Sequence, residues 1–349
     1  MQGITIGAIV TKLNPFIVFV IKRVSMMVLT FFVAVTLIFL LPRLIPGNPL
    51  AMLIYSLVQT GANDPERLKA VERMLLEYFQ LDKPIHEQYF RFIQDLFRGD
   101  LGRSIMFFPN TVSDIIARYL PWTLALLIPA IVASWSVGNI IGVVAAINRG
   151  KITDKVVLPL LAVLQGTPPY IFAMYLLLIF GVYLRILPTG GGWSPTLRPS
   201  LSATFVLDYL KHYILPFTSI FLTSLGGWGL SMRNIALQEL ATDYMDYVRV
   251  LALSQKKTIR YLFKCSALPQ IVGLAIVLGW SVAGSVITEI VFNYPGIGTA
   301  LWRALQSTDY MLIQGFFVIL IGTIILANFI SEIMFAVIDP RVRYAYVGA

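Results

Sequence analysis

Six long runs without a single Asp, Glu, Lys or Arg constrain this chain more than any other feature. Each run has 19 to 30 residues, and a helix needs about 20 apolar residues to cross a bilayer. Charged residues make up only 13% of the chain, too few to coat a water-soluble globule. We therefore expect an all-α, polytopic membrane protein. Its six transmembrane helices should lie at 24–42, 119–148, 156–184, 213–232, 265–288 and 310–331.

The first run is interpreted as a retained helix rather than a signal peptide. It is preceded by Lys22 and Arg23, and it is followed by Leu-Pro-Arg, ending at Arg43. A signal peptide would instead end in a small-residue cleavage site.

The basic residues predict how the helices are oriented. Cytoplasmic loops of membrane proteins carry an excess of Lys and Arg. If the N-terminus is cytoplasmic and Glu332 is counted with the last span, the segments on that side hold 14 basic and five acidic residues, which accounts for the whole net charge of +9. The long outer segment 43–118 is balanced, with nine of each. We therefore expect both termini in the cytoplasm, and the charge indicates orientation rather than nucleic-acid binding.

Segment 43–118 also carries helix signals. Asp64 and Pro65 fit an N-cap and first helical position, and apolar residues recur at helical spacing over 65–80. Pro84 opens a second amphipathic stretch. The segment is either a cap over the helix bundle or a docking surface for a soluble partner.

The inner loop 233–264 is the most informative segment. Its first helix has an apolar stripe made of Leu237, Leu240, Ala241, Tyr244, Tyr247 and Val248. A second, acidic face holds Glu239, Asp243 and Asp246. After Ser254 comes a helix with one basic side, formed by Lys256, Lys257, Arg260 and Lys264. Such helices could rest on the membrane surface, but inner-leaflet lipid is anionic. The acidic face therefore favours a protein partner.

Motifs inside and around this loop resemble those of one transporter family. Segments 243–249 and 252–257, followed by Leu268-Pro269, resemble the cytoplasmic "EAA" loop of ABC-importer permeases, in the variant of the oligopeptide/dipeptide/nickel branch. Further matches occur in order along the chain. They fall at 43–49, 81–84, 97–104, 120–124, 288–298, 309–310 and 339–344. Each match alone is weak, but together they are highly specific and cover about residues 16 to 346.

The resemblance implies an architecture and a set of partners. It implies a MetI-like type-1 ABC permease fold with six transmembrane helices and an extracytoplasmic helical insertion. The parts would be an N-terminus with the first transmembrane helix (1–45), the insertion (46–116), the permease core (117–335) and a cytoplasmic tail (336–349). The implied partners are a second homologous permease, two ABC ATPase subunits, an extracytoplasmic substrate-binding protein and the lipid bilayer, with no nucleic acid.

The resemblance also implies that the inner loop is the coupling helix, which sits in a cleft on an ATPase subunit. The expected coupling residues are Glu239, Asp243, Tyr244, Asp246, Tyr247, Arg249, Ala252, Leu253 and Ser254. Ala252 stands where the family usually has Gly. Since Gly alone adopts φ > 0 without strain, we expect a more helical turn here.

The chain itself has no place for ATP. No Gly-x-x-x-x-Gly-Lys-Ser/Thr motif occurs, and the nearest approach, Gly150-Lys151, has Ala145 at the first position. The single Cys265 belongs to no cluster with metal-ligand spacing. We therefore expect no catalytic, cofactor or metal site in this chain, and expect ATP and Mg²⁺ on the partner ATPase subunits.

Candidate pathway residues lie in two of the runs. Thr167 and Pro168 lie midway along the third run, where Pro168-Pro169 must kink or break the helix. Small and hydroxylated residues form a stripe in the fifth run, namely Ser281, Gly284, Ser285 and Thr288. Such a stripe serves either close helix packing or a translocation path. Gly226-Gly227-Trp228-Gly229 in the fourth run allows the same two interpretations.

A further set of residues is expected to shape the chain after the fifth run. Within the family motif at 288–298, Glu289 would form hydrogen bonds that hold the turn up to Pro295. The structural residues of this motif are Glu289, Asn293, Pro295 and Gly296.

We therefore expect a permease subunit of an ATP-driven ABC importer. With a second permease, it would form the path for oligopeptides or dipeptides delivered by a binding protein. The same machinery could carry oligosaccharides or nickel chelates. A stand-alone secondary transporter or channel is the alternative, but it predicts ionisable groups within the spans or matching broken helices in two halves. An intramembrane enzyme is the weakest interpretation.

Overall fold

The computed structural model describes residues 15–44, 50, 54–55, 58–59, 64–251, 254–280 and 286–338. Over these residues the chain is almost entirely helical, with no strand and one isolated bridge between Arg103 and Thr111. The described residues form two compact units. The first comprises those of Met1–Pro121 and Gly296–Phe329, and the second comprises Trp122–Pro295 and Ile330–Ile338. The expectation of an all-α protein is confirmed.

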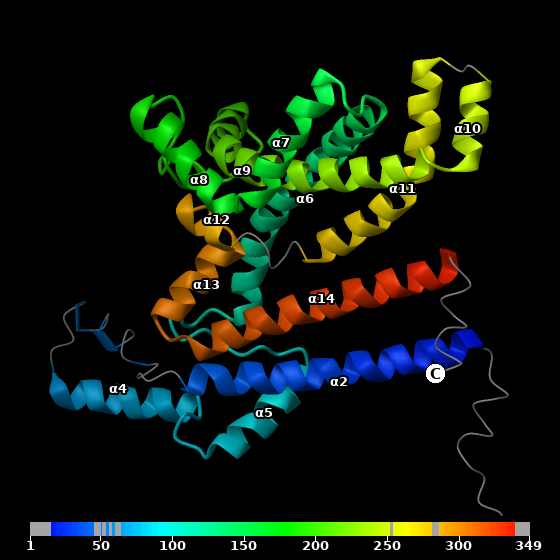
Figure 1. The fold of residues 1–349 in the computed structure, drawn as a ribbon. Helices are drawn as coiled ribbons and strands as arrows, with labels where there is room; N and C mark the ends of the chain where they lie inside the picture. Colours follow the sequence, from blue (N-terminus) through cyan, green and yellow to red (C-terminus); the bar gives the residue numbers. More distant parts are fainter. Residues whose placement is uncertain are drawn as a thin grey trace, which may run out of the picture. The chain divides into compact units, whose positions relative to one another are not determined.

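Among the described residues, five helices are long and apolar enough to cross a membrane. They are α2 (Pro15–Leu44), α6 (Val112–Ile147), α9 (Ala203–Glu239), α11 (Gln255–Trp280) and α14 (Tyr310–Ile338) (Figure 1). The sixth candidate is a bent pair, α7 (Ile152–Gly166) and α8 (Pro169–Leu176), the latter continued by the π-helical turns η1 (Leu177–Tyr183). The pair is bent by 97° at Thr167-Pro168, where the sequence predicts a kink or break.

The helices differ from the expected runs mainly at their ends. α6 starts at Val112 instead of residue 119, and α9 runs from Ala203 to Glu239 instead of 213–232. The expected run 265–288 is covered by α11 and α12 (Val286–Val291), with 281–285 outside the described residues. The charge-free run marks the part of a helix that lies in hydrocarbon, whereas the helix itself continues into the polar region on either side.

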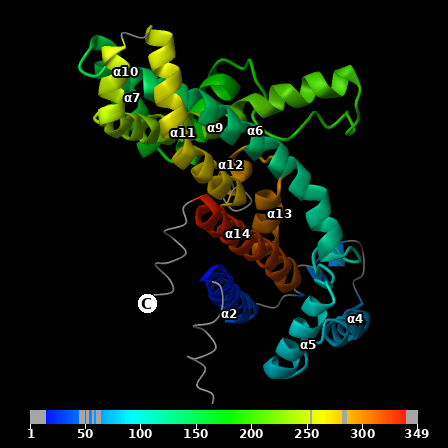
Figure 2. The same cartoon turned by 90° about the vertical axis from the view of Figure 1, so that its right-hand side faces the viewer.

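The first unit is built on α2 and α14, which lie side by side and antiparallel (Figures 1 and 2). Apolar residues of the first turns of α6 pack against α13 (Ile297–Gln306) and α14, through Val112, Ile116, Leu301, Leu312 and Phe316. Gly315 permits this contact, because a Cβ there would lie 2.4 Å from Val112 Cγ1. The first turns of α6 are therefore packed tightly against α14.

Two short helices of the first unit come from segment 43–118. α4 (Pro65–Tyr78) begins as predicted, with the Asp64 carboxylate accepting from the Glu66 backbone N–H at 3.0 Å. α5 (Ile85–Phe97) packs on α2, with the rings of Tyr89 and Phe92 5.2 and 5.5 Å from the Phe39 ring. The segment thus lies against the end of the first transmembrane helix.

The second unit is held together by close helix contacts at glycines. A Cβ on Gly226 of α9 would lie 2.5 Å from Gln165 N and 2.6 Å from Leu161 O of α7. A Cβ on Gly142 of α6 would lie 2.5 Å from Gly229 O of α9. Of the two interpretations of the Gly-rich stretch in the fourth run, close helix packing is the one that these contacts support.

Candidate functional site

The inner loop folds into a short helical projection. α9 ends at Glu239, a turn follows at Leu240–Thr242, and α10 occupies Asp243–Val250. α10 and the first turns of α11 then lie side by side at one end of the second unit (Figures 1 and 2).

One side of α10 is buried in a shared apolar cluster. Met245 is 0% exposed and Val248 is also buried. They pack with residues of three transmembrane helices, namely Val143 and Ala146 of α6, Met232 and Ala236 of α9, and Leu262 of α11. α10 is therefore packed directly against three long helices of the second unit.

The predicted apolar stripe was wrong at three positions, since Ala241, Tyr244 and Tyr247 are all exposed. Tyr244 and Tyr247 are 41% and 66% exposed, although the pattern placed them with Leu237 and Leu240. The pattern assumed one continuous helix, but the turn at Leu240–Thr242 interrupts it and α10 starts in a new register. Met245 is the buried residue that the pattern missed. Counting i, i+3 from the start of α10 would have found Met245 and Val248 together.

The other side of α10 is exposed and carries three of the nine predicted coupling residues. Asp243, Asp246, Tyr247 and Val250 lie on this side. The hydroxyl of Tyr244 donates to a carboxylate oxygen of Glu239, which ties the start of α10 to the end of α9. Partial burial raises the pKa of the Tyr244 phenol above its usual value, so the group stays protonated and remains a donor.

Of the last four predicted coupling residues, only Ser254 is fully described by the structure. Ser254 is exposed, and its carbonyl accepts from the Thr258 backbone N–H at 3.0 Å, which caps the start of α11. Ala252 and Leu253 lie outside the described residues, as does the side chain of Arg249. The basic side predicted for the following helix is present, since Lys256, Lys257, Arg260 and Lys264 are exposed while Leu262 is buried.

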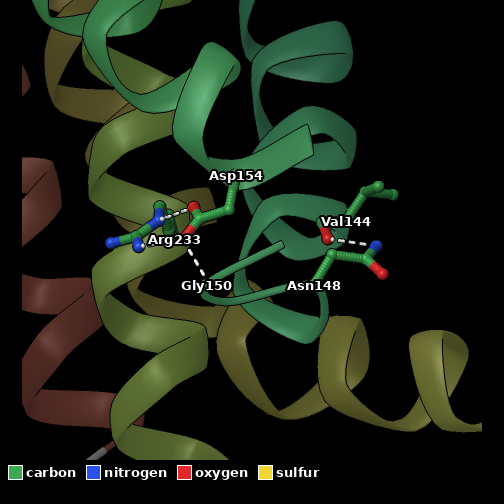
Figure 3. A network of polar contacts seen from close by, with 5 residues as sticks. All are labelled: Val144, Asn148, Gly150, Asp154 and Arg233. Atoms are coloured by element: carbon green, nitrogen blue, oxygen red, sulfur yellow. Dashed lines mark hydrogen bonds and ion pairs between the residues drawn. The ribbon is translucent and has the colours of Figure 1, made fainter. Parts of the chain in front are cut away.

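A buried ion pair lies close to this projection (Figure 3). Arg233 of α9 donates to Asp154 of α7 twice, with Nε 2.8 Å from Oδ1 and Nη2 2.9 Å from Oδ2. Asp154 also accepts from the Gly150 backbone N–H at 3.1 Å. The two residues are 8% and 5% exposed. The pair fixes the α6–α7 turn to α9 one and a half turns before that helix ends.

The sequence did not predict this pair, because Asp154 and Arg233 were considered only as part of the net charge of the cytoplasmic loops. A signal was present: Asp154 lies two residues before the apolar run 156–184, and Arg233 directly follows the run 213–232. Charges at the ends of neighbouring spans lie at similar depth and can pair.

The structure describes three of the six predicted pathway residues. Thr167 lies at the break between α7 and α8, where its hydroxyl donates to Val163 O at 2.8 Å and Pro168 is exposed. Thr288 of α12 is buried. Ser281, Gly284 and Ser285 lie outside the described residues.

The turn after α12 is held by backbone and side-chain hydrogen bonds. The Glu289 side chain is fully buried and accepts from Thr123 Oγ1 at 2.8 Å, and its carbonyl accepts from the Tyr294 N–H at 2.8 Å. Asn293 has φ 44°, a left-handed conformation that Asn tolerates. Pro295 packs directly on Gly192, since a Cβ added to Gly192 would lie 2.6 Å from Pro295 Cγ. Gly296 is the residue before α13, at its N-cap.

Comparison with known proteins places the chain in a family. Residues 138–344, more than half of the chain, match the family described as "Binding-protein-dependent transport system inner membrane component". The chain is 29% identical to the oligopeptide transport system permease protein OppB of Haemophilus influenzae over 328 residues, covering 93% of this chain and 99% of the relative. It is 30% identical to a putative peptide permease protein of Brucella ovis over 313 residues, covering 88% and 93%.

A third relative extends the comparison to smaller peptides. The chain is 27% identical to the di/tripeptide transport system permease protein DppB of Pseudomonas aeruginosa over 342 residues, covering 93% of this chain and 98% of the relative. The family consists of membrane permease components that have no catalytic activity of their own, because the ATPase is a separate subunit. The chain therefore belongs to the binding-protein-dependent transport system inner membrane components, the multi-pass permease subunits of ABC importers.

Proposed function

We propose that this permease subunit imports oligopeptides or dipeptides. The relatives named above are permeases for oligopeptides and di/tripeptides or a putative peptide permease, and the chain aligns with them over most of its length. In this proposal the chain forms the transmembrane path with a second homologous permease. A substrate-binding protein delivers the peptide, and two ATPase subunits bind and hydrolyse ATP with Mg²⁺.

α10 is the segment that transmits the ATPase cycle. Its exposed side, with Asp243, Asp246 and Tyr247, docks in a cleft of the ATPase, while Met245 and Val248 hold its other side against α6, α9 and α11. A displacement of α10 is therefore passed to three transmembrane helices through direct packing. This two-sided character of α10 is the observation that carries the coupling proposal.

The proposed orientation has both termini in the cytoplasm, with residues 46–116 as an extracytoplasmic insertion and 117–335 as the permease core. It is supported by the +9 net charge, which then falls wholly on the cytoplasmic side. α10 and the basic side of α11 lie on that same side, where the ATPases are.

The proposed pathway includes the break between α7 and α8. Backbone that is not helical at membrane depth is tolerated where it is buried in protein or lines a wet cavity. Thr167 and Pro168 are therefore the pathway candidates with the clearest structural support, and Ser281, Gly284, Ser285 and Thr288 remain proposed from the sequence.

The coupling proposal is tested by substrate-stimulated ATP hydrolysis in the complete importer. Asp243→Ala, Tyr247→Ala and Arg249→Ala should lower the stimulation by peptide-loaded binding protein while the complex still assembles. Glu87→Ala, which removes an exposed acid of α5, is the matched control and should leave stimulation unchanged. Unchanged stimulation in all three variants would remove α10 from the coupling path.

The substrate proposal is tested separately, by competition for the binding protein that copurifies or is encoded with this permease. Peptides of two to five residues should stimulate ATP hydrolysis and accumulate in proteoliposomes. Stimulation by oligosaccharides or nickel chelates, and not by peptides, would contradict peptide import without affecting the coupling assignment.

A further inference from the structure

A cavity of about 310 Å³ in the first unit lies at the C-terminal end of α2. Its walls come from α2, α4, α5, the loop after α5, and α14, and α5 lies against α2 in both views (Figures 1 and 2). The cavity is lined by polar and apolar side chains in about equal measure. Its charged residues are Arg43, Arg91, Arg103, Asp95 and Asp100.

Both carboxylates of the cavity are already engaged. Asp95 lies 3.5 Å from Nε of Arg91, one turn away on α5. Asp100 accepts from the Gly102 backbone N–H at 2.8 Å, which holds the loop in shape. Within the described part of the chain, no carboxylate lies in ion-pair range of Arg43 or Arg103. The sequence between 45 and 63 contains no Asp or Glu that could supply one.

The guanidinium of Arg43 is fixed in place by neutral groups. Its Nε donates to Gln88 Oε1 at 3.1 Å and its Nη1 donates to Phe39 O at 2.8 Å. The guanidinium carbon lies 3.7 Å from the centre of the Phe39 ring. A guanidinium has five N–H donors, so these two bonds orient the group and leave donors for a ligand. Arg103 is similarly held by Pro109 O, 2.6 Å from its Nη1.

The position of Arg43 indicates which anion would bind. It is the next-to-last residue of α2, at the end of the apolar span Val20–Leu44, and lipid headgroups lie at this depth. Directly before it, α2 presents an exposed apolar side that includes Leu37, Leu40 and Leu41. An oriented cationic cavity at the end of an exposed apolar helix fits a molecule with an anionic head and apolar chains.

We infer that this cavity binds the phosphate of an anionic phospholipid, with Arg43 and Arg103 as the ligands of the phosphate and the acyl chains along α2. Bidentate and charge-assisted hydrogen bonds from Arg suit phosphate oxygens. The site is independent of the transported substrate and of the coupling helix.

The test uses the complete importer, exchanged into phosphatidylglycerol, phosphatidylcholine or a mixture of both and analysed by native mass spectrometry. The native complex should retain phosphatidylglycerol in preference to phosphatidylcholine. Arg43→Gln combined with Arg103→Gln should lower the retained phosphatidylglycerol about tenfold. Arg118→Gln, an exposed arginine of α6 outside the cavity, is the matched control and should retain the lipid as the native complex does.

Thermal unfolding of the native complex provides a second measurement that does not depend on the variants folding. Short-chain phosphatidylglycerol should raise the midpoint, and short-chain phosphatidylcholine should not. Equal retention or equal stabilisation by the two lipids overturns the inference. Equal stabilisation by glycerol 3-phosphate or inorganic phosphate overturns the lipid assignment in favour of a soluble phosphate.

Discussion

Arg233 and Asp154 form a buried, bidentate ion pair that joins α9 to the start of α7, with both donor–acceptor distances below 3 Å. Two further hydrogen-bonding groups lie around it, the Gly150 N–H on Asp154 and the Asn148 amide, which donates to Val144 O at 2.9 Å (Figure 3). These polar contacts hold the turn between α6 and α7 beside the parts of α6 and α9 on which α10 packs.

Removing one member of this pair should destabilise the permease strongly. Asp154→Asn or Arg233→Met leaves a buried group without its ionic partner, at a cost of about 3–5 kcal/mol. The double variant should lose less than the sum of the single variants, because no unpaired charge remains. Thermal unfolding of the detergent-solubilised protein measures this. Asn148→Ala, which removes only a local hydrogen bond, is the control; a fully additive double variant would contradict the pairing.

The glycine contacts between α7 and α9 give a second prediction. Gly226→Ala should destabilise the protein by about 1–3 kcal/mol, because the new Cβ would meet backbone atoms of Gln165 and Leu161 that cannot rotate away. The adjacent Gly227→Ala is the control, since its nearest atom, Gln165 Cγ, is 4.0 Å away. Comparing the two variants by fluorescence-detected size exclusion after heating tests the prediction. Equal losses would show that helix flexibility, and not close approach, matters here.

The two sides of α10 should respond differently to substitution. Met245→Ala removes a fully buried side chain from the shared cluster and should cost about 2–5 kcal/mol of stability. Tyr247→Ala on the exposed side should leave stability within about 0.5 kcal/mol and reduce only ATPase stimulation. Stability and stimulation measured on both variants separate packing from docking. A loss of stability in Tyr247→Ala as large as in Met245→Ala would contradict this division.

The buried Asp309 organises the loop that precedes α6. Its carboxylate accepts from Ser104 Oγ at 2.5 Å, Met106 N at 3.0 Å and Leu312 N at 3.1 Å. Asp309→Ala should leave these donors unsatisfied and cost about 1–3 kcal/mol. The loss should appear as faster proteolysis near residues 104–107. Ser202→Ala, which removes a cap from the start of α9, should not change cleavage at that loop.

The sequence was sufficient to predict the helical class, the membrane spans and the family. Charge-free runs that are long enough to cross a bilayer as helices leave few alternatives to a membrane protein. Pro168-Pro169 predicted the break in the third span. Helix ends were poorly predicted, since α6 and α9 continue through charged residues that the hydropathy pattern excludes.

Features that depend on a turn, or on residues far apart in the sequence, could not be predicted from local sequence patterns. The exposed positions of Tyr244 and Tyr247 follow from the turn at Leu240–Thr242, whose residues do not interrupt helical spacing in the sequence. The Arg233–Asp154 pair joins residues 79 positions apart, and local patterns carry no information about that distance. The coupling and pathway roles remain predictions.

The break at Thr167-Pro168 has a mechanical consequence. Hydrogen bonds on one side end at Thr167, whose N–H donates to Val163 O, and on the other side begin at Pro168, whose carbonyl accepts from Ile171 N. Neither Pro168 nor Pro169 has an N–H to donate across the gap. Rotating α8 relative to α7 about this point would therefore break neither of these hydrogen bonds, and the restraints that remain are the fixed φ of the two prolines and side-chain packing.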